Sequence, residues 1–334
     1  MACYEPIVAF EVKGLRTENG AKVIIFKDDV NHETEPIAIP CGKCLGCRMD
    51  YSKQWQARIV KEAERWDNNI FLTLTYNDEH LPMKDVVNTE TGEVTTGHPL
   101  VPEHFKNFMK RLRKAYSDKF NHTGIRFYAC GEYGGRTGRP HYHAALFNID
   151  VTLFKDIKKI GVSKAGCALF TSKKIEEIWG KGFITIGELT PESGAYIARY
   201  MLKKQKGPQK EWYYESQGKT PEFTRSSNRH GIAYDYFAEN AEKLIESDSI
   251  YVPRRNSRPQ KMRIPDYGVK TISSISPPLG ARLRTTRELK QRPLSETISE
   301  HNASTASTKS YWDALRDREE NARAKLSKLI RPLE

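Results

Sequence analysis

Long apolar runs are missing from this sequence. In 334 residues the hydrophobic share is 38% and the mean hydropathy is −0.66, and no stretch approaches the roughly 20 apolar residues that a membrane-spanning helix needs. The first ten residues lack the basic segment and the apolar run of a signal peptide. We therefore expect neither an integral membrane protein nor a secreted one.

Cysteine is also scarce, and its placement excludes a disulfide framework. Of six cysteines, Cys41, Cys44 and Cys47 form a C-x-x-C-x-x-C cluster, which fits reduced thiols better than paired ones. Three thiolates at this spacing on a glycine-bearing turn suit structural zinc, which takes four ligands, and Cys3 is the expected fourth. An iron–sulfur cluster and free cysteines in a loop are the alternatives.

Acidic residues are outnumbered by basic ones, 42 to 54, which gives a net charge of +12. Residues 251–334 hold 18 basic and nine acidic residues, so most of the excess lies in this last part. A basic chain with a more basic tail favours a polyanionic partner, of which nucleic acid is the commonest. A cationic surface without a specific partner is the alternative.

Hydrophobic periodicity predicts an α+β fold with a mainly antiparallel sheet covered by helices. We expect strands at 70–76, 125–129, 141–147 and 183–186. Helices are expected at 50–66, 103–116, 172–179, 190–205, 235–246 and 311–330. A long surface loop over 77–102 and a linker with little fixed structure over 273–310 complete the expected organisation.

Three segments follow from this pattern. They are an N-terminal segment with the cysteine cluster (1–50), a catalytic or binding domain (51–250) and a flexible basic C-terminal tail with a linker and a terminal helix (251–334). No internal repeat is visible in the sequence.

Two histidines stand two residues apart on the expected strand at 141–147. Side chains alternate along a strand, so His141 and His143 project to one face. Glu132 lies nine residues earlier, before a glycine-rich turn, and a hairpin would return its carboxylate to the same place. Two imidazoles and a carboxylate with open positions suit Mn²⁺ or Mg²⁺ acting on a phosphodiester. An H-x-H pair of unrelated origin and a solvated turn glutamate are the alternatives.

Two tyrosines share a face of the expected helix at 190–205. Tyr196 and Tyr200 are four residues apart, and Lys203 follows Tyr200 by three. A tyrosine hydroxyl has an ordinary pKa of about 10, so as a nucleophile it needs a polarised phosphate and a nearby ammonium group. Two core-facing aromatic residues on an amphipathic helix are the alternative.

These motifs, in this order, resemble those of the rolling-circle replication initiators of the HUH endonuclease superfamily. The segments CGKCLGCR, FLTLTYND, GEYG…GRPHYHAALF and YIARYMLKK are most similar to the replication-associated proteins of gokushovirus-type Microviridae phages. The resemblance covers residues 41–251.

The resemblance implies the HUH endonuclease fold for the domain at 51–250, and a nickase. His141 and His143 match the metal ligands, with Glu132 as the third, and Tyr200 with Lys203 matches the nucleophile helix, while Tyr196 fits a second tyrosine. Such an enzyme uses Mg²⁺ or Mn²⁺ and cuts single-stranded or double-stranded replicative-form DNA at the origin. It leaves a 5′-phosphotyrosine adduct and a 3′-OH that primes the host polymerase. It works in the host cytoplasm with the host replicative helicase, away from membranes.

Basic side chains near these motifs are expected to contact the DNA. They are Arg139, Arg199, Lys204, Arg225 and Arg229.

Three other interpretations remain open at this point. A transposase or relaxase of a mobile element would use the same chemistry on another DNA. A non-catalytic DNA-binding protein would rely on the zinc knuckle and the basic tail alone. A zinc hydrolase would use His141 and His143 and leave the tyrosine pair without a task.

Overall fold

The computed structural model describes residues 3–18, 20–29, 31–88, 90–135, 137–163, 166–199, 210–254, 257–290, 293–304 and 309–327. The chain divides into two compact units. The first combines residues up to Gln54 with Phe237–Ile250 and the chain from Met262 onward, and the second combines Trp55–Tyr236 with Tyr251–Lys261. Within the described part of the chain, no helix is both long and apolar enough to cross a membrane.

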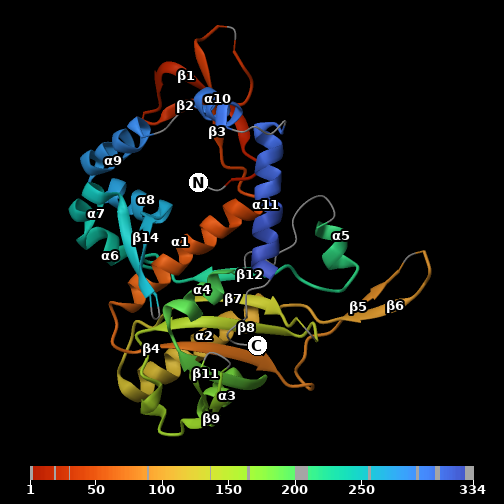
Figure 1. Ribbon diagram of the computed structural model, residues 1–334. Coiled ribbons are helices and arrows are strands. Elements are labelled where there is room, and N and C mark those ends of the chain that lie inside the picture. Colours follow the sequence, from red (N-terminus) through yellow and green to blue (C-terminus); the bar gives the residue numbers. More distant parts are fainter. Residues whose placement is uncertain are drawn as a thin grey trace. The chain divides into compact units, whose positions relative to one another are not determined.

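The second unit is built on a seven-stranded antiparallel sheet, with strand order β12-β7-β8-β4-β11-β10-β9 (Figure 1). Its strands are β4 (Asn69–Tyr76), β7 (Arg126–Tyr133), β8 (Pro140–Phe147), β9 (Lys158–Val162), β10 (Ala168–Thr171), β11 (Gly182–Glu188) and β12 (Phe223–Ser226). The α+β fold with a mainly antiparallel sheet, expected from the sequence, is therefore confirmed.

Both faces of this sheet are covered by helices. These are α1 (Leu45–Ala63), α2 (Pro102–Phe120), α3 (Lys173–Trp179) and α4 (Pro191–Arg199). Phe108 of α2 and Trp179 of α3 pack with Leu72 and Leu74 of β4 on one face. On the other face, Ile59 of α1 and Ile197 of α4 pack with Phe71, Ala145 and Phe147. We call these the α2 face and the α4 face.

Strand alternation explains why β4 serves both faces. In the segment IFLTLTY, Leu72 and Leu74 enter the α2 face, and Phe71 enters the α4 face. Thr73 and Thr75 share the parity of Phe71, so their side chains also project to the α4 face. The α4 face is therefore apolar toward Phe71 and polar toward the end of the strand.

The remaining elements of this unit join the sheet strands. They are β5 (Lys84–Val87), β6 (Val94–Gly97), the 3₁₀ helix η1 (Val151–Phe154), α5 (Lys210–Glu215) and most of α6 (Tyr234–Glu239). The expected loop over 77–102 contains the antiparallel hairpin of β5 and β6, whose ends come so close to residues 217–218 that a side chain at Gly97 would collide with the backbone there.

The first unit contains a three-stranded antiparallel sheet in the order β2-β1-β3. Its elements are β1 (Ile7–Arg16), β2 (Lys22–Ile25), β3 (Thr34–Ile39), α7 (Ala241–Ser247), α8 (Asp266–Ile275), α9 (Pro277–Leu289), α10 (Leu294–Ser304) and α11 (Tyr311–Ser327). Two further strands, β13 (Ser249–Arg254) and β14 (Ser257–Arg263), pair with each other.

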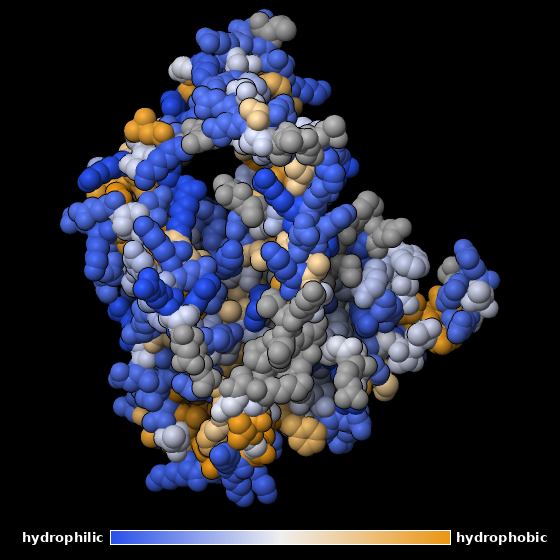
Figure 2. Space-filling model, in the orientation of Figure 1, coloured by the Kyte–Doolittle hydropathy of each residue, from blue (hydrophilic) through white to orange (hydrophobic). Residues whose placement is uncertain are grey.

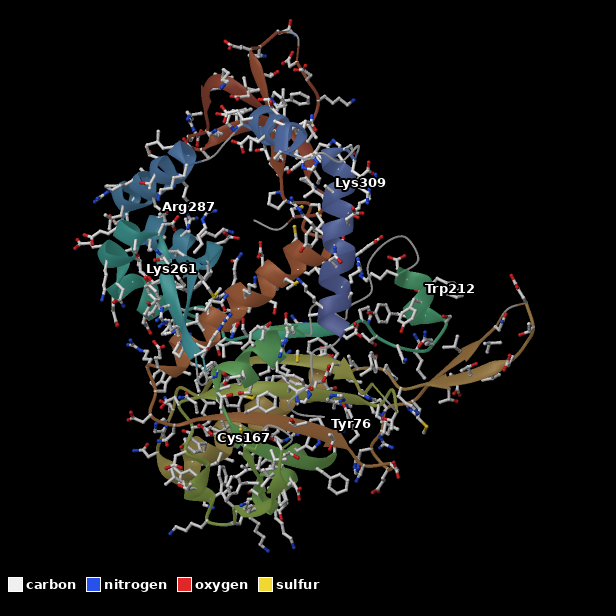
Figure 3. All side chains as sticks on the ribbon, in the orientation of Figure 1. Tyr76, Cys167, Trp212, Lys261, Arg287 and Lys309 are labelled. Atoms are coloured by element: carbon white, nitrogen blue, oxygen red, sulfur yellow. The ribbon has the colours of Figure 1, made fainter. Side chains whose placement is uncertain are left out.

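An ion pair and a helix cap join distant segments within the first unit. The Arg287 guanidinium of α9 donates to both carboxylate oxygens of Asp248 and to the Ile264 carbonyl (Figure 3). The buried Glu319 carboxylate of α11 accepts the backbone N–H of Leu45, the first residue of α1, at 3.1 Å. A carboxylate at a helix N-terminus satisfies an otherwise unpaired N–H and complements the helix dipole.

Helices occupy residues that the sequence led us to expect as a linker. Over 273–310 the structure has the end of α8, all of α9 and all of α10. Pro277 begins α9, Leu283 is fully buried, and Gly280 lies so close to Ser273 that a Cβ would overlap it. Because so few apolar residues anchor these helices, the Ser/Thr/Arg-rich composition concealed them.

The face shown in Figure 2 is mostly hydrophilic, with an apolar group at its lower end near β9 and α3. Ile160 and Val162 of β9, the last strand of the sheet, are 54% and 58% exposed. Isolated exposed apolar residues of this kind are common on protein surfaces.

Glu62 of α1 fixes the helix to the edge of the sheet. Its carboxylate is 3% exposed and accepts hydrogen bonds from Arg126, the Trp66 indole and the Ala233 backbone N–H. We expect Glu62→Ala to lower the free energy of unfolding by about 3 kcal/mol, because it leaves a largely buried guanidinium without its partner. Urea denaturation followed by circular dichroism measures this change.

Glu64→Ala is the matched control, because the Glu64 side chain is 43% exposed and pairs with Lys61 at the surface. Its effect should stay within about 0.5 kcal/mol. Equal losses for the two variants would contradict the structural role of Glu62.

Candidate metal centre on the central sheet

Three potential ligands meet on the α4 face at adjacent strands. In the register of β7 and β8, Glu132 lies opposite His141 and Cys130 lies opposite His143. Opposite residues of antiparallel strands project to the same face. The hairpin of β7 and β8 therefore returns Glu132 to the two histidines, as the sequence spacing predicted.

The three ligand groups are within reach of one cation. The Nε2 atoms of His141 and His143 lie 2.7 and 2.8 Å from the same carboxylate oxygen of Glu132. The three donor atoms all lie within 4.8 Å of one another. The imidazole rings are close to perpendicular, with centroids 4.9 Å apart. Two imidazole nitrogens and a carboxylate oxygen converging in this way form a donor set that fits a divalent transition metal or Mn²⁺.

Hydrogen bonds to the outer ring nitrogens hold both imidazoles in place. His141 Nδ1 lies 3.2 Å from the Arg139 carbonyl oxygen, which can only accept, so this nitrogen carries the proton and Nε2 keeps its lone pair for a cation. His143 Nδ1 lies 2.9 Å from the Thr73 hydroxyl. From the sequence, Thr73 was visible only as part of a Thr-rich strand end; its contact depends on the pairing of β4 with β8.

The electrostatics of the cluster favour an ionised carboxylate. Glu132 is 1% exposed, and this burial raises its pKa, but hydrogen bonds and charge interactions with His141 and His143 outweigh the burial and lower the pKa to about 2. Glu132 is thus held as an anion, the form in which a carboxylate binds metal.

Tyr142, between the two histidines, fixes the strand from its other face. Its hydroxyl lies 2.7 Å from the Tyr76 hydroxyl (Figure 3 labels Tyr76), donates to the Val101 carbonyl at 2.9 Å, and accepts the Val101 N–H. Tyr76 in turn bonds His104 Nδ1 at 2.7 Å. This buried polar network pins β4 and β8 to the start of α2, so the histidine side of β8 stays on the α4 face.

Tyr196 lies directly beside the cluster. Its ring is 5.4 Å from that of His143, centroid to centroid, in an edge-to-face arrangement, and 6.2 Å from that of Phe71. Tyr196 is 6% exposed and belongs to the apolar cluster of the α4 face. The structure therefore brings α4 against the histidine pair. The other expected residues of this helix region, Tyr200, Lys203 and Lys204, lie outside the described residues.

The expected DNA-binding arginines are placed differently from one another. Arg139 pairs with Asp78 and the Tyr76 carbonyl, next to the cluster because its own carbonyl holds His141. Arg199 ends α4, and Arg229 is exposed after β12. Arg225 lies opposite Ala129, a residue of the α2 face, so its side chain projects away from the cluster.

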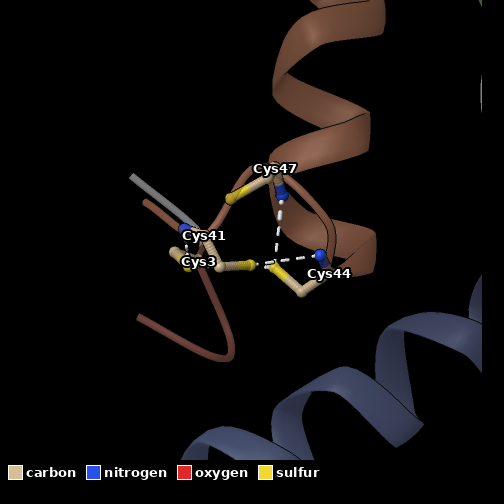
Figure 4. Close-up of side chains that lie close together, drawn as sticks. All are labelled: Cys3, Cys41, Cys44 and Cys47. Carbon is tan, nitrogen blue, oxygen red and sulfur yellow. Dashed lines mark hydrogen bonds between the residues drawn. The ribbon is translucent and has the colours of Figure 1, made fainter. Parts of the chain in front are cut away.

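The four cysteines singled out in the sequence also converge, within the first unit (Figure 4). The Sγ atoms of Cys3, Cys41, Cys44 and Cys47 all lie within 4.8 Å of one another. The residues nearest to them donate backbone hydrogen bonds to sulfur: Cys44 N to Cys41 Sγ at 3.2 Å, and Tyr4 N to Cys44 Sγ at 3.3 Å. Cys47 stands on the first turn of α1, which begins at Leu45, before the expected start at residue 50.

Hydrogen bonding and burial tune these thiols in opposite directions. Burial raises the pKa of Cys44, but the backbone N–H groups of Cys47 and Tyr4 and the neighbouring thiols outweigh it and bring the pKa down to about 7. Burial raises the pKa values of Cys3 and Cys47. The cluster thus has one thiol prone to ionise and three more sulfurs around it, a donor set that fits a tetrahedral thiophilic metal.

The fold and this site define an α+β protein with a candidate two-histidine, one-carboxylate metal centre on its sheet. The family model for the replication-associated protein ORF2 matches residues 69–205, from β4 through both tyrosines. The chain is 33% identical to the replication-associated protein ORF2 of Spiroplasma virus 4, over 100% of this chain and 98% of that protein. It is 29% identical to the replication-associated protein VP4 of Bdellovibrio phage phiMH2K, over 80% of this chain and 76% of that protein.

The chain therefore belongs to the family of phage replication-associated proteins, which confirms the resemblance drawn from the sequence motifs. A third relative, the replication-associated protein ORF4 of Chlamydia phage 1, is 30% identical over 54% of this chain and 42% of its own length. No solved structure matches the chain.

Removal of one imidazole should abolish metal binding at the sheet. We expect His141→Ala to bind no Mn²⁺ at concentrations that saturate the unchanged protein, because two donors remain. Thr73→Val should weaken Mn²⁺ binding about 10–100-fold by releasing the His143 ring. The electron paramagnetic resonance signal of free Mn²⁺ measures both effects.

His80→Ala serves as the control, since His80 is exposed and bonds to Asn77, away from the three ligands. It should bind Mn²⁺ like the unchanged protein. Undiminished Mn²⁺ binding by a folded His141→Ala protein would show that the ion sits elsewhere.

Proposed function

We propose that this protein is a site-specific single-strand DNA endonuclease and strand transferase that initiates rolling-circle replication of a phage genome. The observation that carries the proposal is the convergence of Glu132, His141 and His143 on the sheet face that Tyr196 of α4 also contacts. The replication-associated names of the relatives support the same interpretation.

The proposed reaction exchanges one phosphodiester for another. A tyrosine oxygen bonds to the scissile phosphorus, the bond from phosphorus to the 3′ oxygen breaks, and that oxygen takes up a proton to become the 3′-OH primer. The DNA 5′ end stays attached as a phosphotyrosine, which conserves the bond energy for a second transfer that recloses the circle. No water molecule is consumed in either transfer.

We assign the nucleophile to Tyr200, because Lys203 follows it by three residues and can lie beside it on a helix. Tyr196 is the proposed second tyrosine. Its ring packs against His143, so it also positions that imidazole. Arg139, next to the cluster, is the arginine best placed to contact a phosphate of the bound strand.

The divalent cation proposed for the cluster is Mg²⁺ or Mn²⁺, held by Glu132, His141 and His143. When bound, it neutralises charge on the scissile phosphate and makes the phosphorus more open to attack. The protein's own part is to fix the ligands: the Arg139 carbonyl and the Thr73 hydroxyl orient the two rings before the DNA arrives.

We further propose that the four cysteines hold a structural Zn²⁺. The ligand set is complete within the chain, and the N–H donors around the sulfurs stabilise thiolates. Such a site ties the residues before β1 to the first turn of α1.

The proposed partners are origin DNA, single-stranded or in the double-stranded replicative form, and the host replicative helicase and polymerase, which would extend the 3′-OH. The proposed place of action is the host cytoplasm.

An adduct assay tests the nuclease proposal. With Mn²⁺ and a single-stranded oligonucleotide that carries the origin, we expect a protein–DNA product that survives boiling in detergent and migrates as a larger species on a denaturing gel. Tyr200→Phe should reduce it by at least about 100-fold, because the variant has no oxygen to bond to phosphorus. His141→Ala should also abolish it.

Tyr196→Phe is the matched comparison, because it keeps the ring that packs on His143 and removes only the hydroxyl. If it still forms the first adduct but fails to reclose the circle, Tyr196 acts in the second transfer. An undiminished adduct in Tyr200→Phe would overturn the assignment of Tyr200, and metal-dependent binding without any adduct would overturn the nuclease proposal.

Metal analysis tests the zinc proposal. We expect the purified protein to contain one Zn²⁺ per chain by inductively coupled plasma mass spectrometry. Cys44→Ser should lose the metal and lower the melting temperature, because structural zinc contributes directly to folding. Cys167→Ser, which changes a thiol outside the cluster, should keep it. Equal zinc content in both variants would contradict the proposal.

A further inference from the structure

Phe183 of β11 is an exposed aromatic residue on an otherwise well-covered sheet. It is 61% exposed, whereas the next residue, Ile184, is 2% exposed and Ile186 is 3% exposed. Ile184 and Ile186 pack in the α2 face. Because side chains alternate along a strand, Phe183 projects to the α4 face, the face of the candidate metal centre.

The strand register places Phe183 in one row with the cluster. Phe183 lies opposite Thr75, Thr75 lies opposite His141, and His141 lies opposite Glu132. Directly opposite residues in antiparallel strands are same-face neighbours. Only β4 stands between the strands of His141 and Phe183, so their backbones are about 10 Å apart.

Exposure alone would not distinguish this side chain, because single exposed apolar residues are common. Phe26 is 66% exposed and Trp212 is 70% exposed. Trp212 stands on α5 (Figure 3), and Phe26 follows β2 in the first unit. What sets Phe183 apart is its row: an open ring faces the same side of the sheet as the proposed ligands, one strand away.

We propose that Phe183 stacks on an unpaired base of the DNA strand whose phosphate is bound at Glu132, His141 and His143. An aromatic ring stacks on any base, so it can hold a single strand without reading its sequence. The net charge of +12 favours a polyanionic strand over a protein partner at this face. The inference rests on the proposed function, because it takes DNA as the ligand of the cluster.

Stacking selects an unpaired substrate. A base inside a duplex already stacks on its neighbours and cannot offer its face to a protein ring, so a ring beside the cleavage site favours strands that are open there. Phe183 is thus a positioning residue: it fixes the nucleotide next to the scissile phosphate and leaves the bond exchange to the metal cluster and the tyrosine.

Binding of a single-stranded origin oligonucleotide tests the proposal. Fluorescence anisotropy without divalent metal measures affinity while no cleavage occurs. We expect Phe183→Leu to weaken binding roughly tenfold, because it keeps an apolar side chain but removes the ring. Phe183→Tyr and Phe183→Trp should bind like the unchanged protein. Affinity for the fully duplex oligonucleotide should be the same in all four proteins.

Phe26→Leu is the matched control, since it removes a ring of similar exposure in the first unit. It should leave single-strand affinity unchanged. Equal affinity of Phe183→Leu and the unchanged protein would overturn the proposal, and so would equal losses in the Phe26 and Phe183 variants or a loss that the tyrosine variant shares.

Photocrosslinking locates the base. Oligonucleotides that carry 5-iododeoxyuridine at successive positions around the cleavage site should crosslink to the peptide that contains Phe183 from positions next to the scissile phosphate, as read by mass spectrometry. Crosslinks to this peptide from distant positions alone would contradict the proposal.

The outcomes for this inference and for the nuclease proposal are separable. If the adduct forms but Phe183→Leu binds normally, stacking fails and the nuclease stands. If Phe183→Leu weakens single-strand binding but no adduct ever forms, the stacking surface stands and the nuclease fails.

Discussion

The antiparallel register of β7, β8 and β4 is the constraint on which the candidate site depends. It places Glu132, His141 and Thr75 side by side on the α4 face and sends Tyr142 to the α2 face. A slip of one residue would exchange the faces and bury the histidines against α2. The two faces are filled with different chemistry, a buried tyrosine network and apolar core on one and a charged cluster on the other, so each face excludes the slipped register.

The cluster is rigid because each ligand is held twice. The backbone of β7 or β8 fixes where a side chain starts, and a second contact fixes its end: the Arg139 carbonyl for His141, the Thr73 hydroxyl for His143, and both imidazoles for Glu132. Tyr196 adds an edge-to-face ring contact to His143. Preorganisation of this kind lets a site bind a cation without first ordering its own ligands.

Local rules predicted the core of the fold and part of the site. The spacing of His141 and His143 implied a shared face, because alternation needs no knowledge of distant residues, and a hairpin sufficed to add Glu132. The part played by Thr73 could not be predicted, because it depends on the pairing of β8 with a strand 70 residues earlier. The helices at 277–289 and 294–304 were missed, because they bury few apolar residues.

The cap on α1 links the two ends of the described chain in time as well as in space. The N–H of Leu45 is satisfied by a carboxylate 274 residues further on. A ribosome makes the cysteine cluster and the start of α1 early, but the group that completes this helix end emerges only after the whole sheet has been synthesised. The first unit therefore reaches its final packing later than the second, and a nascent chain carries an unfinished N-terminal region for most of its synthesis.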